Sequence, residues 1–373
     1  MFGGNQKISG RQMERLLVLD WVGKAGLLLP RFAERASGRS FLISLLSAIA
    51  LTLGYTWCVR TLSRKIENDF YGYVCYRLGR PTAVFICFIY WMYAFVNTLF
   101  LLRLFAAIAV TFVLPETQEW ILIIIAALAG IYAASGGLEV RARFSEVLYP
   151  FVVYPLIILM AVAAFSVRAD YVVPQAGSLS MDTLCHGAQM FSAFGGVGLF
   201  LYLAPCIDDQ KRAGQALFRG VGITLAGEFI LFLIIIGTFG EQGMKALPWP
   251  LVTLMSSVEI PGGFLQRWDV IFTVLLLGSF FAALTTGMYY LGFLTGEIFS
   301  GGKRRTHLLI PAVLVTIAAC ICQSYGTAAR LYTVLNGYVF LPVAIFFTIL
   351  LLITEKVKER RCAENKNSRS FNE

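Results

Sequence analysis

Ten apolar segments, each long enough to cross a lipid bilayer, constrain this chain more than any other feature. The hydrocarbon core of a membrane is about 30 Å thick, so a crossing helix needs about 20 mainly apolar residues. Charged side chains make up only 14% of the 373 residues and hydrophobic ones 58%, which is typical of an integral membrane protein. We therefore expect an all-α membrane protein with ten transmembrane helices, near residues 11–32, 40–60, 82–113, 119–135, 144–167, 181–206, 213–240, 266–298, 307–324 and 330–353.

Basic residues cluster in the short segments between these spans. If the N-terminus is cytoplasmic, most of the 31 lysines and arginines fall on the cytoplasmic side, as the positive-inside rule requires. The first external loop, with Arg31, Arg35 and Arg39, is the exception. We expect a multi-pass protein of the cell membrane with both termini cytoplasmic, one transmembrane domain over residues 1–353 and a charged cytoplasmic tail over residues 354–373. Such short clusters do not favour nucleic-acid binding, and the partner they imply is membrane lipid.

The first span contains charged residues and glycines where a plain anchor would have leucines. Asp20 and Lys24 lie inside it, together with Gly23 and Gly26. An ionisable side chain in hydrocarbon costs several kcal/mol, so its default interpretation is functional. The two glycines allow the helix to break.

The sixth span repeats this pattern. It contains Phe194-Gly195-Gly196-Val197-Gly198 and ends at Pro205, as the first span ends at Pro30. Two matched breaks five spans apart predict a five-plus-five inverted repeat, residues 11–167 and 181–353, with broken helices 1 and 6 around a midplane binding site. The alternative for each glycine cluster is close helix packing.

We expect the ligand to contact residues at these breaks and on the third and eighth spans. The predicted ligand-binding residues are Trp21, Gly23, Lys24, Ala25, Gly26, Tyr93, Asn97, Phe194, Gly195, Gly196, Gly198, Thr285 and Thr286. Lys24 has three possible roles. The first is snorkelling to an interface, which its mid-span position disfavours. The second is an ion pair with Asp20 or with Glu228 of the seventh span, and the third is a ligand or coupling role, in which the ammonium contacts a ligand carboxylate or replaces a coupling cation.

Residues 136–146 join spans four and five and carry Glu and Arg at helical spacing, which predicts a solvated surface helix with ion pairs. No metal or other cofactor is expected, because Cys320 and Cys322 have no metal-ligand spacing and the chain has only two histidines. We find no paired carboxylates, nucleophile–base set or phosphate loop, so we expect no enzyme activity.

Several motifs resemble those of one family, the spore-germination permeases, which are the B subunits (GerAB-type) of germinant receptors. The motifs are Lys7-Ile8-Ser9-Gly10-Arg11-Gln12, Gly-x-x-Gly-Leu-Leu-Leu-Pro30, Gly137-Leu138-Glu139-Val140-x-Ala-Arg143-x-x-Glu146, Val173-Pro174-Gln175 and Gln266-Arg267-Trp268-Asp269. This family lies within the amino acid–polyamine–organocation transporter superfamily. The resemblance implies a LeuT-type fold, a nutrient site at the two breaks, a larger A subunit and a lipoprotein C subunit as partners, and the spore inner membrane as location.

Two positions depart from the family pattern. Lys24 stands where a small or hydroxyl residue is usual, and Gly198 stands where a glutamate is common. Two functions are open at this point. The first is a germinant-receptor subunit that binds a small zwitterionic nutrient, for which we expect an amino acid, and signals to its partners. The second is a proton-coupled amino acid permease in which Glu228 or Lys24 carries the coupling charge.

Overall fold

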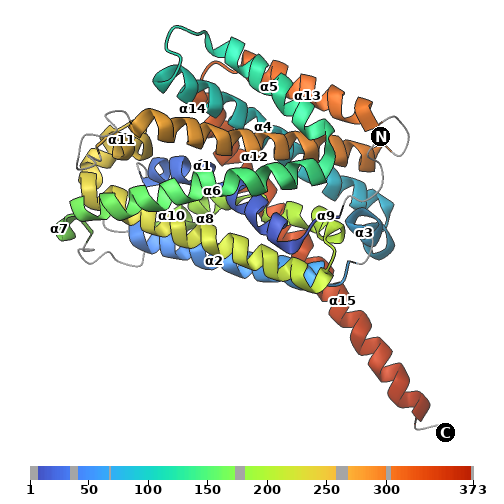
Figure 1. The fold of residues 1–373 in the computed structure, drawn as a ribbon. Helices are drawn as coiled ribbons and strands as arrows, with labels where there is room; N and C mark the ends of the chain where they lie inside the picture. The colour runs from blue at the N-terminus through green and yellow to red at the C-terminus, as the bar shows by residue number, and fades with distance from the viewer. Residues whose placement is uncertain are drawn as a thin grey trace.

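The computed structural model describes residues 7–33, 41–66, 69–172, 181–257, 268–299 and 304–370. This part of the chain is helical, and it forms no β-strands beyond an isolated bridge between Ile8 and Ile207 (Figure 1). The long helices are α1 (Gly10–Ala33), α2 (Phe41–Ser63), α4 (Arg80–Phe112), α5 (Glu119–Ser135), α6 (Gly137–Ala163), α10 (Gln210–Ala246), α12 (Trp268–Ile298), α13 (Arg304–Ile321) and α15 (Leu341–Ser370). The shorter ones are α3 (Phe70–Leu78), α7 (Ala169–Val172), α8 (Met181–Phe191), α9 (Phe200–Leu203), α11 (Pro250–Ser257) and α14 (Tyr325–Leu335).

Six helices of the described chain are long and apolar enough to cross a membrane, or seven if one bent pair counts as a single span. The six cover 41–63, 80–112, 137–166, 212–246, 270–298 and 325–358. Helix α1 is not among them and carries two charged residues in its middle. Helices α5 and α13 are apolar but shorter. The chain is thus a multi-pass helical membrane protein.

The predicted break in the first span is wrong, because α1 is one helix from Gly10 to Ala33. The glycines serve helix packing instead. A Cβ at Gly23 would lie 2.5 Å from Ser279 Oγ and 2.6 Å from Phe280 Cε1 on α12, and one at Gly26 would lie 3.1 Å from Leu251 Cδ2 on α11. Because glycine has no side chain, α11 and α12 can approach α1 closely at these two positions. This is the close helix packing given above as the alternative to a break.

The sixth expected span is bent by 41° between residues 181–194 and 197–206. Two 3₁₀ turns, Ser192–Phe194 and Val197–Leu199, flank the bend. Gly196 has φ +101°, a conformation that favours glycine because other residues clash there. The bend therefore exposes backbone groups in the middle of the bundle.

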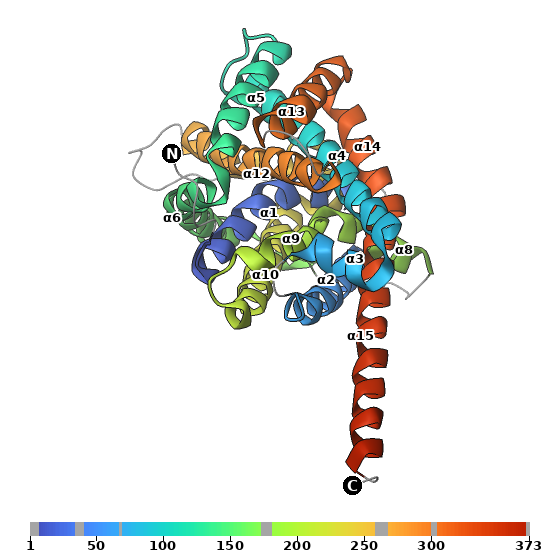
Figure 2. The same ribbon diagram turned by 90° about the vertical axis from the view of Figure 1, so that its right-hand side faces the viewer.

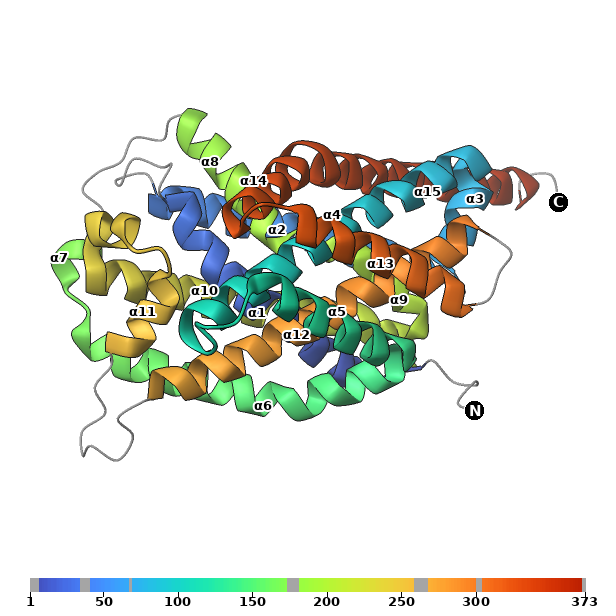
Figure 3. The same ribbon diagram turned by 90° about the horizontal axis from the view of Figure 1, so that it is seen from above.

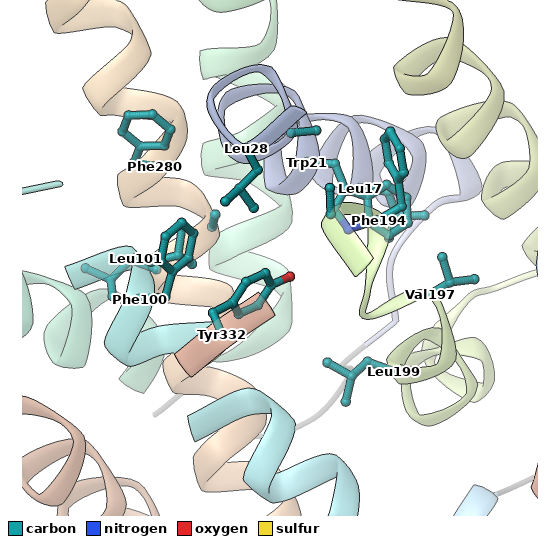
Figure 4. Close-up of a cluster of buried hydrophobic side chains, with 14 of the residues drawn as sticks. Leu17, Trp21, Leu28, Phe100, Leu101, Phe194, Val197, Leu199, Phe280 and Tyr332 are labelled. Carbon is teal, nitrogen blue, oxygen red and sulfur yellow. The ribbon is translucent and has the colours of Figure 1, made fainter. Parts of the chain in front are cut away.

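Helix α1 lies inside the bundle and packs along α10, α6 and α12 (Figures 1 and 2). Helix α2 packs on α8, and α4 packs on α12. Buried aromatic and aliphatic side chains fill the space where α1, α4, α14 and the bend meet, among them Trp21, Phe100, Phe194 and Tyr332 (Figure 4). This crossing is the centre of the core.

The C-terminal helix runs from the core to well outside the bundle. Helix α14 passes through a π-helical turn, η5 (Asn336–Phe340), into α15, which projects beyond the other helices (Figures 1 and 2). Glu355 of α15 is held by α3: it accepts hydrogen bonds from Tyr73 Oη at 2.6 Å and from Arg77. Burial, followed by this bond to Glu355, raises the pKa of Tyr73 above its usual range, so the hydroxyl remains a donor.

The start of α1 and the far end of α15 lie toward the same side of the molecule, opposite α7 and α11 (Figure 3). At this side the segment before α1 is tied to the end of the sixth expected span. Ile8 N donates to Cys206 O at 2.9 Å, and Asp208 N donates to Ile8 O at 3.2 Å. The N-terminal end of α1 is thus fixed to the element that follows the bend.

Candidate ligand-binding site

A cavity lies between α1, α4, α12 and the bend of the sixth expected span. Its lining residues are Leu17, Asp20, Trp21, Lys24, Tyr93, Ala94, Asn97, Gly195, Gly196, Leu199, Ala283, Thr286, Gly287 and Tyr290. The space between these atoms amounts to about 440 Å³, and the centres of water molecules can occupy about 40 Å³ of it. A cavity needs about 10–15 Å³ of such water-accessible space to hold one water molecule, so this cavity has room for a few waters, and a ligand of amino acid size requires its walls to move apart.

Lys24 projects into this cavity and has no carboxylate partner among the described residues. Its side chain is buried, with 3% exposed. The ammonium donates to Asn97 Oδ1 at 3.2 Å and lies 5.5 Å from the centre of the Tyr332 ring. Neither of the two ion pairs considered for Lys24, with Asp20 or with Glu228, is present in this part of the chain. Among the described residues, the ammonium therefore has direct contacts only with an amide and an aromatic face.

Asp20 lies one helical turn before Lys24 and is linked to a different cation. Thr286 Oγ1 donates to Asp20 Oδ1 at 2.8 Å, and Arg141 Nη2 donates to the same hydroxyl. A threonine hydroxyl thus connects a carboxylate of α1 to a guanidinium of α6.

Arg141 is the main residue that sequence reasoning missed. The segment 136–146 was expected to be solvated, and its Glu139–Arg143 ion pair does lie on the surface, at 2.6 Å. Arg141 between them is only 2% exposed and stacks 4.7 Å from the centre of the Tyr289 ring. Its Nε and Nη1 have no hydrogen-bond partner in the described chain. Burial here depends on packing against α1 and α12, which helical spacing alone does not reveal.

Glu228 lies outside the cavity. It is 3% exposed on α10, and its Oε2 has no partner in the part of the chain that the structure describes. The same oxygen lies 3.5 Å from the position that a Cβ on Gly26 would take. Glu228 therefore faces the packed side of α1, away from the lysine.

The structure gathers seven of the predicted site residues, besides Asp20, around the cavity: Trp21, Lys24, Tyr93, Asn97, Gly195, Gly196 and Thr286. It does not place Gly23, Ala25, Gly26, Phe194, Gly198 or Thr285 there. The two α1 glycines pack against neighbouring helices, and Ala25 and Phe194 lie in the hydrophobic core. Thr285 Oγ1 donates to Ala282 O at 2.7 Å within its own helix.

Gly198 lines a second cavity, with about 270 Å³ between its atoms. Tyr55, Tyr90 and Asn336 also line it, and Tyr93 and Gly196 belong to both cavities. A Cβ at Gly196 would lie 2.8 Å from Tyr93 Oη. These two residues therefore form the partition between the cavities.

The last helix contributes a polar contact to the bend that sequence reasoning also missed. Asn336 Nδ2 and Tyr332 Oη both donate to Ser192 O, at 2.5 and 3.3 Å. Asn336 is 1% exposed, and its amide occupies the space that a Cβ on Gly195 would need. The spacing of Tyr332 and Asn336, four residues apart in an apolar segment, is the signal that places both on one helix face.

No group of three or more His, Cys, Asp or Glu side chains that could hold a metal occurs in the described residues. What the cavity offers is one carboxylate, one ammonium, an amide and hydroxyl groups within an apolar wall. These groups can bind a small molecule that carries one positive and one negative charge.

Comparison with protein families identifies a match over residues 7–328 to the family described as "Spore germination protein". The chain is 24% identical over 366 residues to spore germination protein YndE of Bacillus subtilis (strain 168), covering 96% of this chain and 99% of that protein. It is 23% identical over 346 residues to spore germination protein B2 of the same organism, covering 90% and 93%. Spore germination protein GerLB of Bacillus cereus is 21% identical over 363 residues, with 96% of each covered.

Two solved structures share the fold. MhsT in complex with L-phenylalanine superposes with a TM-score of 0.74 at 16% identity, covering 93% of this chain and 90% of that one. A Na⁺-coupled sialic acid symporter in a substrate-bound outward-open state gives a TM-score of 0.65 at 13% identity, covering 91% and 79%. At such identities the likeness concerns the fold alone.

Proposed function

Because the chain belongs to the spore germination protein family, we propose that it is the nutrient-binding membrane subunit of a spore germinant receptor. Its ligand is a small amino acid, bound in the cavity between α1, α4, α12 and the bend. The confirmed family membership and the transporter-like fold support this role.

The observation that carries the proposal is the unpaired, buried Lys24 beside a carboxylate in one cavity. A buried ammonium without an anionic partner is costly, and an anionic ligand group would offset that cost. Lys24 and Asp20 are four residues apart on one helix, about 6 Å along its axis. An α-amino acid presents a carboxylate and an ammonium that complement this pair.

We place the ligand carboxylate at Lys24 and the amide of Asn97. The ligand ammonium faces Asp20, whose charge is shared through Thr286 with Arg141. The backbone of Gly195 and Gly196 forms the opposite wall. The narrow cavity favours a small side chain, and a larger one requires displacement of Tyr93.

The ten-span, five-plus-five topology belongs to this proposal. It is supported by the six described helices, or seven with the bent pair, that are long and apolar enough to cross a membrane, and by α1, α5 and α13, which lie at the three remaining expected spans. Helix α1 packs on α10 while α2 packs on α8, which is the exchange that a two-fold relation between halves requires. The positive-inside rule then puts both termini in the cytoplasm.

The route from ligand to partner subunits runs through the last helix. Tyr332 lies beneath the Lys24 ammonium, and Tyr332 and Asn336 are bonded to the bend at Ser192. The same helix continues through η5 and α15 to Glu355 and beyond the bundle. Ligand contacts that shift Tyr332 or the bend would therefore bias the position of α15. A larger A subunit and a lipoprotein C subunit, expected from the family, would respond to it.

The alternative is a working amino acid permease, favoured by the fold shared with a Na⁺-coupled symporter. Uptake of labelled amino acid into proteoliposomes that collapses with the proton gradient would support transport. Binding without uptake would support the receptor.

The zwitterion hypothesis is tested by a thermal-shift screen of amino acids on the purified protein. For the amino acid that raises the unfolding midpoint most, we compare its carboxamide, which lacks the carboxylate, and its N-acetyl form, which lacks the ammonium. We expect both derivatives to lose most of the shift. Equal stabilisation by the carboxamide would refute the role of Lys24 as the carboxylate partner.

A further inference from the structure

A third cavity, an open cleft larger than the other two, lies between the first turns of α1 and α10. It is lined by Ser9, Gly10, Arg11, Glu14, Arg212, Gln215, Ala216 and Arg219. The cleft is open to solvent and has a volume of about 560 Å³. It is separate from the amino acid cavity, with which it shares no lining residue.

The cleft is strongly basic. Three arginines face it and Glu14 is its one acidic residue. Arg212 pairs with Asp209 at 3.2 Å but remains exposed. Arg11 and Arg219 make no ion pair with any described residue, so at least two guanidinium groups are available to an anion. Arginine suits phosphate in particular, because its planar donors can bind two oxygens at once.

Arg219 lies at the start of a stripe of exposed apolar residues on the outer face of α10. Arg219, Ile223, Ala226 and Ile230 recur at helical spacing and are all exposed, so they share one face. Ile223 is 41% and Ile230 49% exposed. Beside them, a Cβ added at Gly222 or Gly227 would meet no atom within 4 Å. The stripe is therefore a shallow apolar track that begins at the mouth of the basic cleft.

The arginines of the cleft lie at the level where α10 enters the membrane. The apolar span of α10 begins at Arg212, and Arg219 lies seven residues further, about 10 Å along the helix axis. Arg212 and Arg219 thus lie within the lipid headgroup layer at one end of α10. The apolar stripe continues from there into the hydrocarbon core. A soluble anion would use the arginines and leave the stripe unused, whereas a phospholipid would use both.

We propose that this cleft binds the phosphate headgroup of an anionic phospholipid, with an acyl chain along Ile223 and Ile230. The lipid bridges the beginnings of α1 and α10. Because α1 carries Asp20 and Lys24, the bound lipid fixes the helix that forms one wall of the amino acid cavity. The lipid site itself stands on its own observations and does not depend on which ligand occupies that cavity.

The test measures the thermal unfolding midpoint of the full chain in neutral detergent during titration with phosphatidylglycerol or phosphatidylcholine. We expect phosphatidylglycerol alone to raise the midpoint. The double variant R212Q/R219Q should weaken this effect at least about tenfold in lipid concentration, since the loss of even one contact to a charged group costs more than about 1.4 kcal/mol. The matched control is R143Q, which removes an exposed arginine elsewhere, and it should respond as the wild type does.

A further variant separates binding from folding damage. E14Q removes the acidic residue of the cleft, so it should strengthen the response to phosphatidylglycerol, a gain that a misfolded protein would not show. Water-soluble glycerol phosphate distinguishes a lipid site from a soluble-anion site. An equal shift with glycerol phosphate, an equal loss in R143Q, or an unchanged response in R212Q/R219Q would each overturn the proposal.

Discussion

Replacing Lys24 with methionine should separate ligand binding from stability. The Lys24 ammonium contacts only the Asn97 amide and the Tyr332 ring within the described chain. Its removal therefore leaves no carboxylate without a partner. Methionine has a similar length and no charge to desolvate, so the unfolding midpoint without ligand should be unchanged or higher.

Ligand affinity should fall sharply in the same variant. A hydrogen bond to a charged group contributes about 1.5–3 kcal/mol, which corresponds to about 10- to 150-fold in Kd. The assay is a titration of wild type and K24M with the amino acid that stabilises the wild type, read as the shift in unfolding midpoint. K245M is the matched control, since Lys245 pairs with Glu241 on α10, outside the cavity.

Two results would refute this reasoning. Wild-type affinity in K24M would show that the lysine does not contact the ligand. A fall in the ligand-free midpoint equivalent to several kcal/mol would show that Lys24 forms a structural ion pair in the membrane-bound protein, because that is the cost of breaking a buried pair.

Three further outcomes follow from the packing. R141M should destabilise the protein by about 1–3 kcal/mol, because Thr286, which donates to Asp20, loses its charged donor, and the double variant D20N/R141M should recover part of that loss in chemical unfolding. G23A should lower the unfolding midpoint, by the equivalent of about 1–3 kcal/mol, because its Cβ would overlap α12; G227A, where no atom lies within 4 Å, should leave it equal or raised by up to about 1 kcal/mol. E355Q should weaken the attachment of α3 to α15, seen as faster amide hydrogen exchange over residues 70–78 with the bundle unchanged.

Apolar composition predicted a helical membrane protein correctly, because that prediction needs only local sequence, and six described helices, or seven with the bent pair, are long and apolar enough to cross a membrane. The bend at Gly195–Gly196 lies within the predicted glycine cluster, and there a positive φ makes glycine necessary. Gly23 and Gly26 looked the same in sequence, but they serve close packing inside an intact α1. Whether a glycine bends a helix or admits a neighbour depends on helices far away in sequence.

The charged residues show the same contrast between what the local sequence reveals and what depends on distant helices. Lys24 and Asp20 were visible because they interrupt an apolar segment. Arg141 was not, because it lies among surface charges and is buried only by contacts with α1 and α12. Tyr332 and Asn336 reach the bend from the other end of the chain, a contact that no local pattern encodes.

The π-helical turn η5 sets the rotation of α15 relative to α14. A π turn holds one more residue than an α turn, so its conversion to α would advance everything after Phe340 by one residue, about 1.5 Å and 100° of rotation. Glu355 would then turn away from Tyr73 and Arg77, and the part of α15 outside the bundle would present a different face. A change of one residue within the membrane-embedded part of this helix would thus appear outside the bundle as a rotation of α15.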